Sequence, residues 1–317
     1  MYDNERCKGF GSGDKNFCSQ RYNEKQCKNK GGGNFAPYRR KIMFKAGKHE
    51  FPLGKRTYVM GILNYTPDSF SDGGLYFTPE KALEHAILMV EQGADIIDIG
   101  ANSTRPDAVI LTAEEEKERL VPVIEAICGK VKAAVSVDTF YPVCAEAALR
   151  AGADIINDVS GVFNPDMARL AVKYGAGYIV MHNPCGAADT AEYENGVVAD
   201  ARKFFVDAIT LAAQCGLPKN QLCLDPGLGF GKSYEDNLEL IANMQWLKFK
   251  DIALLVAGSR KRFIGIASGE EISAMRDAGT VAAHTAAIAG GADIVRVHDV
   301  FSGVQGARVA DAVFRKV

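Results

Sequence analysis

Polar side chains that could do chemistry recur along this chain, each directly after a short apolar run. They are Asn64, Asn102 to Arg105, Asp138, Asn157, His182, Asp225, Ser259 with Lys261, and Arg296 with His298. One such residue would mean little, because Asn and Asp often close turns at strand ends. Eight in succession indicate that the fold gathers them on one surface.

The chemistry of these side chains describes a substrate with two parts. The donors and acceptors suited to a flat, polar heterocycle are Asp138, Asn157, Asp225 and Lys261. The cationic donors suited to an anion are Arg105, Arg296 and His298, and arginine can bind phosphate oxygens through two hydrogen bonds. Asn64 offers a neutral oxygen that suits Mg2+ bound to phosphates. A planar ring carrying a phosphate group fits this inventory.

The apolar runs are predicted to be strands that alternate with amphipathic helices. They cover residues 58–63, 95–99, 134–137, 154–156, 177–181, 222–224, 253–256 and 293–297. Near-continuous Val, Ile and Leu is typical of parallel strands covered on both faces. Eight βα units predict a single (β/α)8 TIM barrel, with a doubly wound open sheet as the alternative. In a barrel, the loops after the strands form the active site.

Several helix boundaries are marked in the sequence. Thr78 before Pro79 predicts a helix start, and Thr112 with Glu115 predicts a capping box. The phrase Gly-Ala-Asp-Ile begins at Gly93, Gly152 and Gly291, where glycine can end a helix in the left-handed conformation before the next strand.

Composition limits the classes of function. The 317 residues are 47% hydrophobic and carry a formal charge of −2, so neither nucleic acid nor a membrane surface is expected as a partner. No apolar run approaches the roughly 20 residues of a membrane span, and no signal peptide is evident, so a cytoplasmic location is expected.

Residues 1–40 lack hydrophobic periodicity and are predicted to be a disordered extension to a barrel domain at 41–317. Met43 could be the true start.

The eight cysteines do not form a metal-binding pattern. Five scattered ones are expected to be reduced thiols of the core: Cys128, Cys144, Cys185, Cys215 and Cys223. The three near the N-terminus match no usual zinc spacing: Cys7, Cys18 and Cys27.

The ordered motifs from about Lys55 to the C-terminus resemble the dihydropteroate synthase family. They are MGILNYTPDSFSDGG (60–74), DIIDIGANSTRP (95–106), SVDT (136–139), INDVSG (156–161), MH (181–182), LDPGLGFGK (224–232), SRKRFIG (259–265) and RVHDV (296–300). The glycines of the DPGLGFGK run let a ligand approach the backbone closely. It is not a P-loop, because its GK[ST] ending does not stand at the required spacing after a first glycine.

The resemblance implies a transferase of folate biosynthesis. It would join 6-hydroxymethyl-7,8-dihydropterin diphosphate to p-aminobenzoate, releasing diphosphate and leaving 7,8-dihydropteroate. Diphosphate would depart first, and the arylamine would attack a carbocation-like CH2. The resemblance also implies Mg2+ as cofactor and a homodimer formed through outer helices.

The family's site residues transfer to matching positions of this chain. The pterin residues would be Asp138, Asn157, Met181, Asp225, Phe230 and Lys261. The p-aminobenzoate residues would be Thr104, Arg105, Pro106 and Ser259, with Phe230 and Lys261 also contributing. The diphosphate residues would be Asn64, Arg105, Arg296 and His298, with Asn64 also holding the metal. The catalytic residues would be Asp138, Lys261, Arg296 and His298. Segments 65–77 and 101–111 would close over the diphosphate and exclude water.

Some positions depart from the usual family pattern, and others have a structural interpretation. The departures are Asn102 in place of glutamate, Asp107 in place of glycine, Asn183 to Gly186, and Ala257 with Gly258. His182 could contact a ligand or belong to the core, whereas His49, His85 and His284 are interpreted as structural. Glu114 to Glu116 are expected to form a solvated face at a helix N-terminus.

Three other functions compete with the synthase. A methyltetrahydrofolate–corrinoid methyltransferase resembles this fold and binds a pterin, but needs no diphosphate site. A pterin-binding pseudoenzyme would bind the pterin diphosphate without turnover. A phosphate-binding barrel isomerase or aldolase has no need for both Asp225 and Asn157.

Overall fold

The computed structural model describes residues 42–65, 78–102, 110–184 and 190–315. The predicted disordered extension at 1–40 lies outside them, as do the three N-terminal cysteines.

Eight parallel strands close into a barrel in the order β10-β3-β4-β5-β6-β7-β8-β9. Their bounds are β3 Tyr58–Asn64, β4 Ile96–Gly100, β5 Ala134–Asp138, β6 Ile155–Asp158, β7 Gly177–Met181, β8 Leu222–Asp225, β9 Ala253–Val256 and β10 Ile294–Val297. All eight predicted strands are confirmed to within two residues. Because β10 pairs with β3, the sheet has no open edge, and the doubly wound alternative is wrong.

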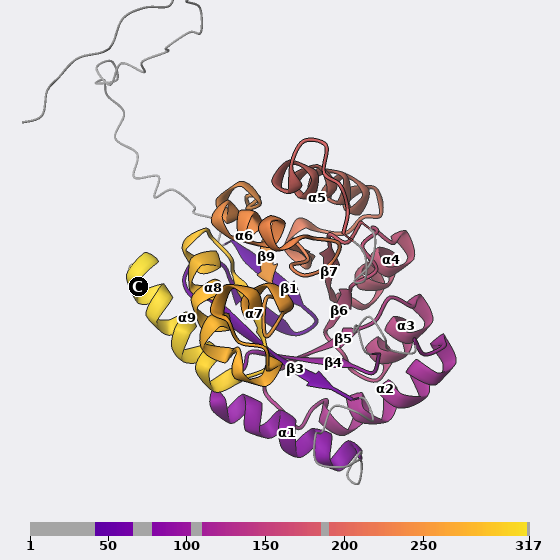
Figure 1. The fold of residues 1–317 in the computed structure, drawn as a ribbon. Coiled ribbons are helices and arrows are strands. Elements are labelled where there is room, and N and C mark those ends of the chain that lie inside the picture. Colours follow the sequence, from indigo (N-terminus) through magenta and orange to yellow (C-terminus); the bar gives the residue numbers. More distant parts are fainter. Residues whose placement is uncertain (1–41, 66–77, 103–109, 185–189, 316–317) are drawn as a thin grey trace, which may run out of the picture. The chain divides into compact units, whose positions relative to one another are not determined.

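The helices form a ring around these strands (Figure 1). Their bounds are α1 Pro79–Gln92, α2 Ala113–Ile127, α3 Pro142–Arg150, α4 Pro165–Tyr174, α5 Val197–Gln214, α6 Tyr234–Ala242, α7 Arg262–Ser268, α8 Asp277–Ala289 and α9 Val300–Phe314. The described residues also form three short 3-10 turns: η1 Lys219–Gln221, η2 Met244–Trp246 and η3 Ser273–Met275.

The predicted helix boundaries are confirmed. Thr78 accepts a hydrogen bond from the Lys81 amide at the start of α1. Thr112 and Glu115 form both hydrogen bonds of the capping box at the start of α2. The three glycines of the repeated phrase have φ of +107°, +109° and +104°, a conformation that residues with a Cβ rarely adopt.

An unpredicted hairpin plugs one end of the barrel. It consists of β1 (Met43–Ala46) and β2 (His49–Pro52), which pair antiparallel. Phe44 and Phe51 are buried in one cluster with the inward side chains of the strands, including Ile96 and Ile294. This apolar cluster fills the N-terminal end of the barrel, so any polar site must lie at the other end.

Side-chain alternation then places polar groups above the apolar cluster. Ile96, Ala134 and Ile155 belong to that cluster and point inward. The residues two positions later along the same strands must point inward as well, because strand side chains alternate between faces. Those residues are Asp98, Ser136 and Asn157, and all three are buried.

Four of the five cysteines that were expected in the core lie in the described residues. Cys128, Cys144, Cys215 and Cys223 are free thiols; Cys144 and Cys223 are buried, whereas the other two are only half-buried. Cys185 lies outside the described residues.

None of the described helices combines the length and apolarity that a membrane span requires. The cytoplasmic location stays a prediction.

Candidate functional site

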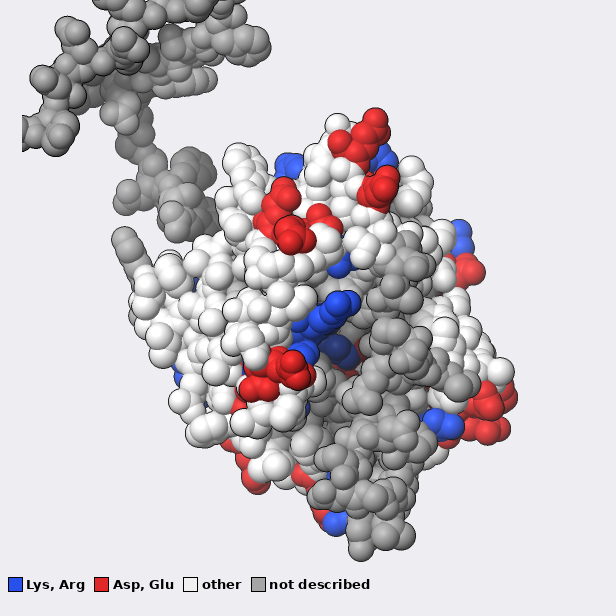
Figure 2. Space-filling view, in the orientation of Figure 1, with Lys and Arg blue, Asp and Glu red and all other residues white. Residues whose placement is uncertain are grey.

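Polar side chains meet at the C-terminal end of the barrel. The strand register places Asp138 beside both Gly100 and Asn157, and Met181 beside Asp225. Arg296 lies in the last strand, β10, and His298 directly follows that strand at the same mouth. Lys and Arg side chains gather in a hollow near the centre of the face seen in Figure 2. The structure therefore brings the predicted ring-binding residues to one place with Arg296 and His298, the two predicted anion-binding residues that it describes.

Asp98 joins these two groups at the base of the site. Its Oδ2 accepts hydrogen bonds from Asn157 Nδ2 at 3.0 Å and from Arg296 Nε at 2.6 Å. The side chain is fully buried, and its Oδ1 has no partner among the described atoms. Asp98 was not predicted as a site residue. An acid in the interior of an otherwise apolar strand was the available signal, because a buried carboxylate needs partners.

Arg296 bridges two carboxylates across the barrel. Besides Asp98, its Nη2 contacts Asp138 Oδ2 at 2.8 Å. Burial raises the pKa of Asp138 to about 7, the nearby Arg296 opposes that shift, and Asp98 adds to it. For Arg296, the two carboxylates outweigh the effect of burial and raise the pKa of the guanidinium. The arginine therefore stays charged while Asp138 can titrate near neutral pH.

Lys261 lies over the aromatic ring of Phe230. Its Nζ is 4.2 Å from the ring centroid and also donates to the Leu228 carbonyl. Burial lowers the pKa of Lys261 to about 7, whereas the charge of Asp225 opposes the shift. Burial also raises the pKa of Asp225. Acid and amine groups with pKa values moved toward neutrality are typical of functional sites.

The glycines of the DPGLGFGK run make room mainly for the protein itself. A Cβ on Gly227 would lie 2.1 Å from the His182 carbonyl oxygen, and one on Gly229 would lie 2.7 Å from Lys261 Cδ. Both have positive φ. Lys232 at the end of the run is buried, and its Nζ donates to the carbonyls of His182 and Phe230 at 3.0 and 2.7 Å. This run therefore shapes the wall that carries Phe230 and supports Lys261.

Ser259 and His298 contact each other at the mouth. Ser259 Oγ accepts a hydrogen bond from the His298 amide at 3.2 Å and lies 3.0 Å from His298 Nδ1. The predicted p-aminobenzoate residue and the predicted diphosphate residue are therefore neighbours.

Two of the histidines lie in buried hydrogen-bonded positions. His182 is buried and its Nε2 is 2.9 Å from Asp200 Oδ1, while burial lowers its pKa to about 4. His284 Nε2 accepts a hydrogen bond from the Gly258 amide, which agrees with its structural interpretation.

The prediction of a solvated face at Glu114 to Glu116 is wrong for Glu116, which is fully buried. The segments that follow β4 and β5 cover it, and helical spacing places it on the same buried face of α2 as Leu120 and Val123.

Part of the predicted site lies outside the described residues. Thr104, Arg105 and Pro106 lie outside the described residues, as do Asp107, Cys185 and Gly186. The same is true of most of the two segments expected to close over the diphosphate. Asn64 is described at the end of β3.

Known proteins resemble this chain in sequence and in fold. A profile of pterin binding enzymes matches residues 60–298. A dihydropteroate synthase of Synechocystis is 44% identical over 85% of this chain and 94% of its own length. One from Clostridium beijerinckii is 42% identical over 86% of this chain and its full length.

The chain belongs to the dihydropteroate synthase family.

Solved structures of family members superpose on this fold. The Xanthomonas albilineans dihydropteroate synthase with 4-aminobenzoic acid has a TM-score of 0.80 and 41% identity, over 86% of this chain and 98% of that chain. The Thermus thermophilus enzyme in complex with 6HMPPP has a TM-score of 0.74 and 39% identity, over 86% of this chain and all of that chain. The family, the barrel and the transferase class that the resemblance implied are thereby confirmed.

Proposed function

We propose that this chain condenses 6-hydroxymethyl-7,8-dihydropterin diphosphate with p-aminobenzoate, giving 7,8-dihydropteroate and diphosphate. The observation that carries the proposal is the buried contact of Asp98 with both Asn157 and Arg296. It joins a ring-binding amide to an anion-binding guanidinium, as a substrate with a flat ring and a diphosphate requires. The relatives named dihydropteroate synthase support the same reaction.

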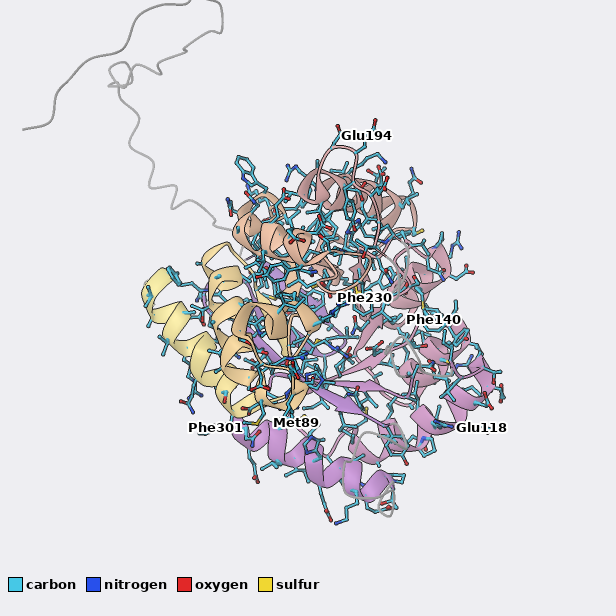
Figure 3. All side chains as sticks on the ribbon, in the orientation of Figure 1. Met89, Glu118, Phe140, Glu194, Phe230 and Phe301 are labelled. Carbon is cyan, nitrogen blue, oxygen red and sulfur yellow. The ribbon has the colours of Figure 1, made fainter. Side chains whose placement is uncertain are left out.

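The pterin ring would occupy the polar layer above the apolar end of the barrel. Asp138, Asn157 and Asp225 supply acceptors and an amide at its floor, and Lys261 adds a cationic donor. Met181 and Phe230 would form apolar walls, and Figure 3 labels Phe230 well inside the ring of helices. The p-aminobenzoate would bind above, near Ser259 and the loop that carries Thr104, Arg105 and Pro106.

The reaction would proceed by departure of the leaving group. The bond between the pterin CH2 carbon and the diphosphate oxygen breaks, and its electron pair leaves with the diphosphate. The lone pair of the arylamine then forms the C–N bond, and the nitrogen loses a proton to solvent. Arg296 and His298 would stabilise the charge on the diphosphate, and the Asp138 carboxylate would stabilise the carbocation-like carbon. No general base is needed for the first step.

Asn64 is the described residue that we propose as the protein ligand of Mg2+. Among the described residues, no three His, Cys, Asp or Glu side chains converge on a possible metal position. Mg2+ often takes one or two protein oxygens and completes its coordination with phosphates and water. Asn64 at the end of β3 would supply such an oxygen. The ion would provide charge stabilisation on the leaving diphosphate.

The direct test incubates the purified protein with the pterin diphosphate, p-aminobenzoate and Mg2+. We expect dihydropteroate and diphosphate to form in equal amounts, and chelation of Mg2+ by EDTA to abolish both. Binding of the pterin diphosphate without either product would instead identify a pseudoenzyme. The methyltransferase and isomerase alternatives are set aside because the curated relatives above 40% identity are synthases.

A homodimer through the outer helices is also proposed, from the apolar surface of α9. Phe301, Val309, Val313 and Phe314 are each half or more exposed, and Figure 3 labels Phe301 at the outer edge. Exposed apolar patches of this kind mark interaction surfaces. Light scattering of the wild type is expected to give twice the 34.2 kDa mass of one chain. The Val309→Glu variant is expected to have the mass of one chain. A wild-type protein that stays at the single mass at micromolar concentration would refute the dimer.

A further inference from the structure

Arg260 has a backbone conformation that residues with a Cβ rarely adopt. Its φ is +59°, in the left-handed region. The residue lies between Ser259 and Lys261, in the short segment that joins β9 to α7. A residue other than glycine stays in this region only where its surroundings impose it, and such residues often lie at functional sites. The groups that hold Arg260 in this conformation are therefore candidates for a role in the site.

Three residues at the start of α8 hold the main chain and the side chain of Arg260. Its amide donates to Thr280 Oγ1 at 3.0 Å, and its carbonyl accepts from Arg276 Nη1 at 3.1 Å. Its guanidinium donates from Nε and Nη2 to the two carboxylate oxygens of Asp277, both at 2.7 Å. Both polar groups of the Arg260 main chain and its charged side chain thus have partners on one helix.

The ion pair with Asp277 is the contact that ties the side chain of Arg260 to α8. Its two hydrogen bonds fix the orientation of the guanidinium as well as its distance, because the fork of the arginine matches the carboxylate. Each side chain of the pair is 25% exposed, so solvent screens the pair only in part. A return of Arg260 to negative φ would redirect its side chain and break both hydrogen bonds.

The left-handed turn sets the directions of the two site residues beside it. Ser259 is buried, and its Oγ contacts the amide and the ring of His298. Lys261 has its Nζ 4.2 Å from the centre of the Phe230 ring. Because one backbone angle lies between them, a change of φ at Arg260 would move the hydroxyl and the ammonium relative to each other. Both contacts therefore depend on this turn.

We propose that Asp277 is a positioning residue that, through Arg260, maintains the left-handed turn presenting Ser259 and Lys261 to the substrates. Asp277 needs no contact with either substrate for this role. The helix that carries it packs beside α7, at whose start Lys261 stands (Figure 1). The inference rests on the proposed function, because that function gives Ser259 and Lys261 their substrates.

Two substitutions of Arg260 that differ by one methyl group test this inference. Arg260→Ala and Arg260→Gly both remove the guanidinium, but only alanine has a Cβ that disfavours the left-handed region. We expect Arg260→Ala to lower kcat/KM for both substrates about tenfold, a factor in line with the cost of that conformation. Arg260→Gly should stay within about threefold of wild type, because glycine adopts this φ without steric cost. The kinetics are measured well below the Tm of each variant.

Asp277→Ala removes the other half of the ion pair and leaves an arginine in the unfavourable conformation. We expect about the same tenfold loss of kcat/KM. Adding Arg260→Gly should return kcat/KM to within about threefold of wild type, because the turn then needs no ion pair. A pair that served only the stability of the fold would not give this rescue.

Asp251 provides the matched control. It is the other described residue besides glycine with a positive φ, +66°, and it precedes β9 at the end of the barrel opposite the mouth. Asp251→Ala and Asp251→Gly should both leave kcat/KM unchanged.

Two outcomes would overturn the inference. Equal losses in Arg260→Ala and Arg260→Gly would show that the guanidinium itself serves a substrate. An Asp277→Ala enzyme within twofold of wild type would show that the ion pair does not control the turn. If Asp277→Ala fails to fold, the comparison of alanine with glycine at position 260 decides alone.

A measurement independent of turnover separates this inference from the proposed function. The Arg260 amide donates to Thr280, and the Lys261 amide donates to the Gly258 carbonyl at 3.3 Å. Both amides should lose protection from hydrogen exchange in Asp277→Ala and Arg260→Ala, and keep it in Arg260→Gly. Unchanged protection in Asp277→Ala would refute the role of Asp277. A wild type that makes no dihydropteroate would defeat the proposed function, whereas hydrogen exchange would still decide whether Asp277 holds the turn.

Discussion

Arg296→Ala is expected to lower kcat/KM for the pterin diphosphate about 100-fold. The sequence alone predicts a loss of one to two decades, because a charged hydrogen bond contributes about 1.5 to 3 kcal/mol. The structure favours the upper end of that range. Arg296 is the shared partner of Asp98 and Asp138, so its removal leaves one buried and one partly buried carboxylate without their cation. An unpaired buried charge costs about 3 to 5 kcal/mol of folding stability, and a melting curve must accompany the kinetics.

Two further variants test whether the effect of Arg296→Ala is specific to the guanidinium at this position. Arg296→Lys keeps the charge but cannot contact both carboxylates in the same fork geometry, so it should recover only part of the loss. Arg169→Ala removes an exposed arginine of α4 that pairs with Asp166 of the same helix, and should leave kcat/KM unchanged. An Arg296→Ala enzyme within a factor of two of wild type would show that the guanidinium does not serve the diphosphate.

Asp138→Asn is expected to lower kcat about 100-fold and to change the shape of the pH profile. The amide has the size of the carboxylate but no charge to stabilise a cationic carbon, and a charged contact of about 2.7 kcal/mol corresponds to two decades. Arg296 Nη2 can still donate to the amide oxygen, so we expect the variant to fold. Asp166→Asn, an exposed acid of α4, is the matched control.

The pH dependence follows from the direction of two pKa shifts. Burial raises the pKa of Asp138 to about 7, so the carboxylate appears as the pH rises through that value. Burial lowers the pKa of Lys261 to about 7, so the ammonium is lost over the same interval. If both charged forms are needed, kcat/KM of the wild type peaks near pH 7, with apparent values that belong to the whole cluster.

Asp138→Asn should remove the acidic limb of this profile and keep the alkaline one. The measurement is kcat/KM for the pterin diphosphate from about pH 5 to 9. A variant that retains the full bell shape would show that another group causes the acidic limb.

Local pattern was enough to predict the barrel strands and most of the described site. Asp138, Asn157 and Asp225 end apolar runs, and parallel strands of a closed barrel all end at the same mouth. Their convergence therefore follows once eight parallel strands are assigned. The hairpin β1–β2 was missed because two four-residue strands carry too little periodicity. Its role comes from Phe44 and Phe51, which pack against strands distant in sequence.

Asp98 and Glu116 show what local pattern leaves open. Asp98 gains its role from Arg296, 198 residues away, and nothing near either residue announces that pairing. Helical spacing places Glu116, unlike exposed Glu114, on the buried face of α2, but only the structure shows that Asn102 and Thr139 donate to its carboxylate. The sequence by itself determined which polar groups reach the mouth of the barrel, since strand direction and alternation are local properties. Only the tertiary structure decided which of them touch, because hydrogen-bond partners across a barrel depend on closure of the whole sheet.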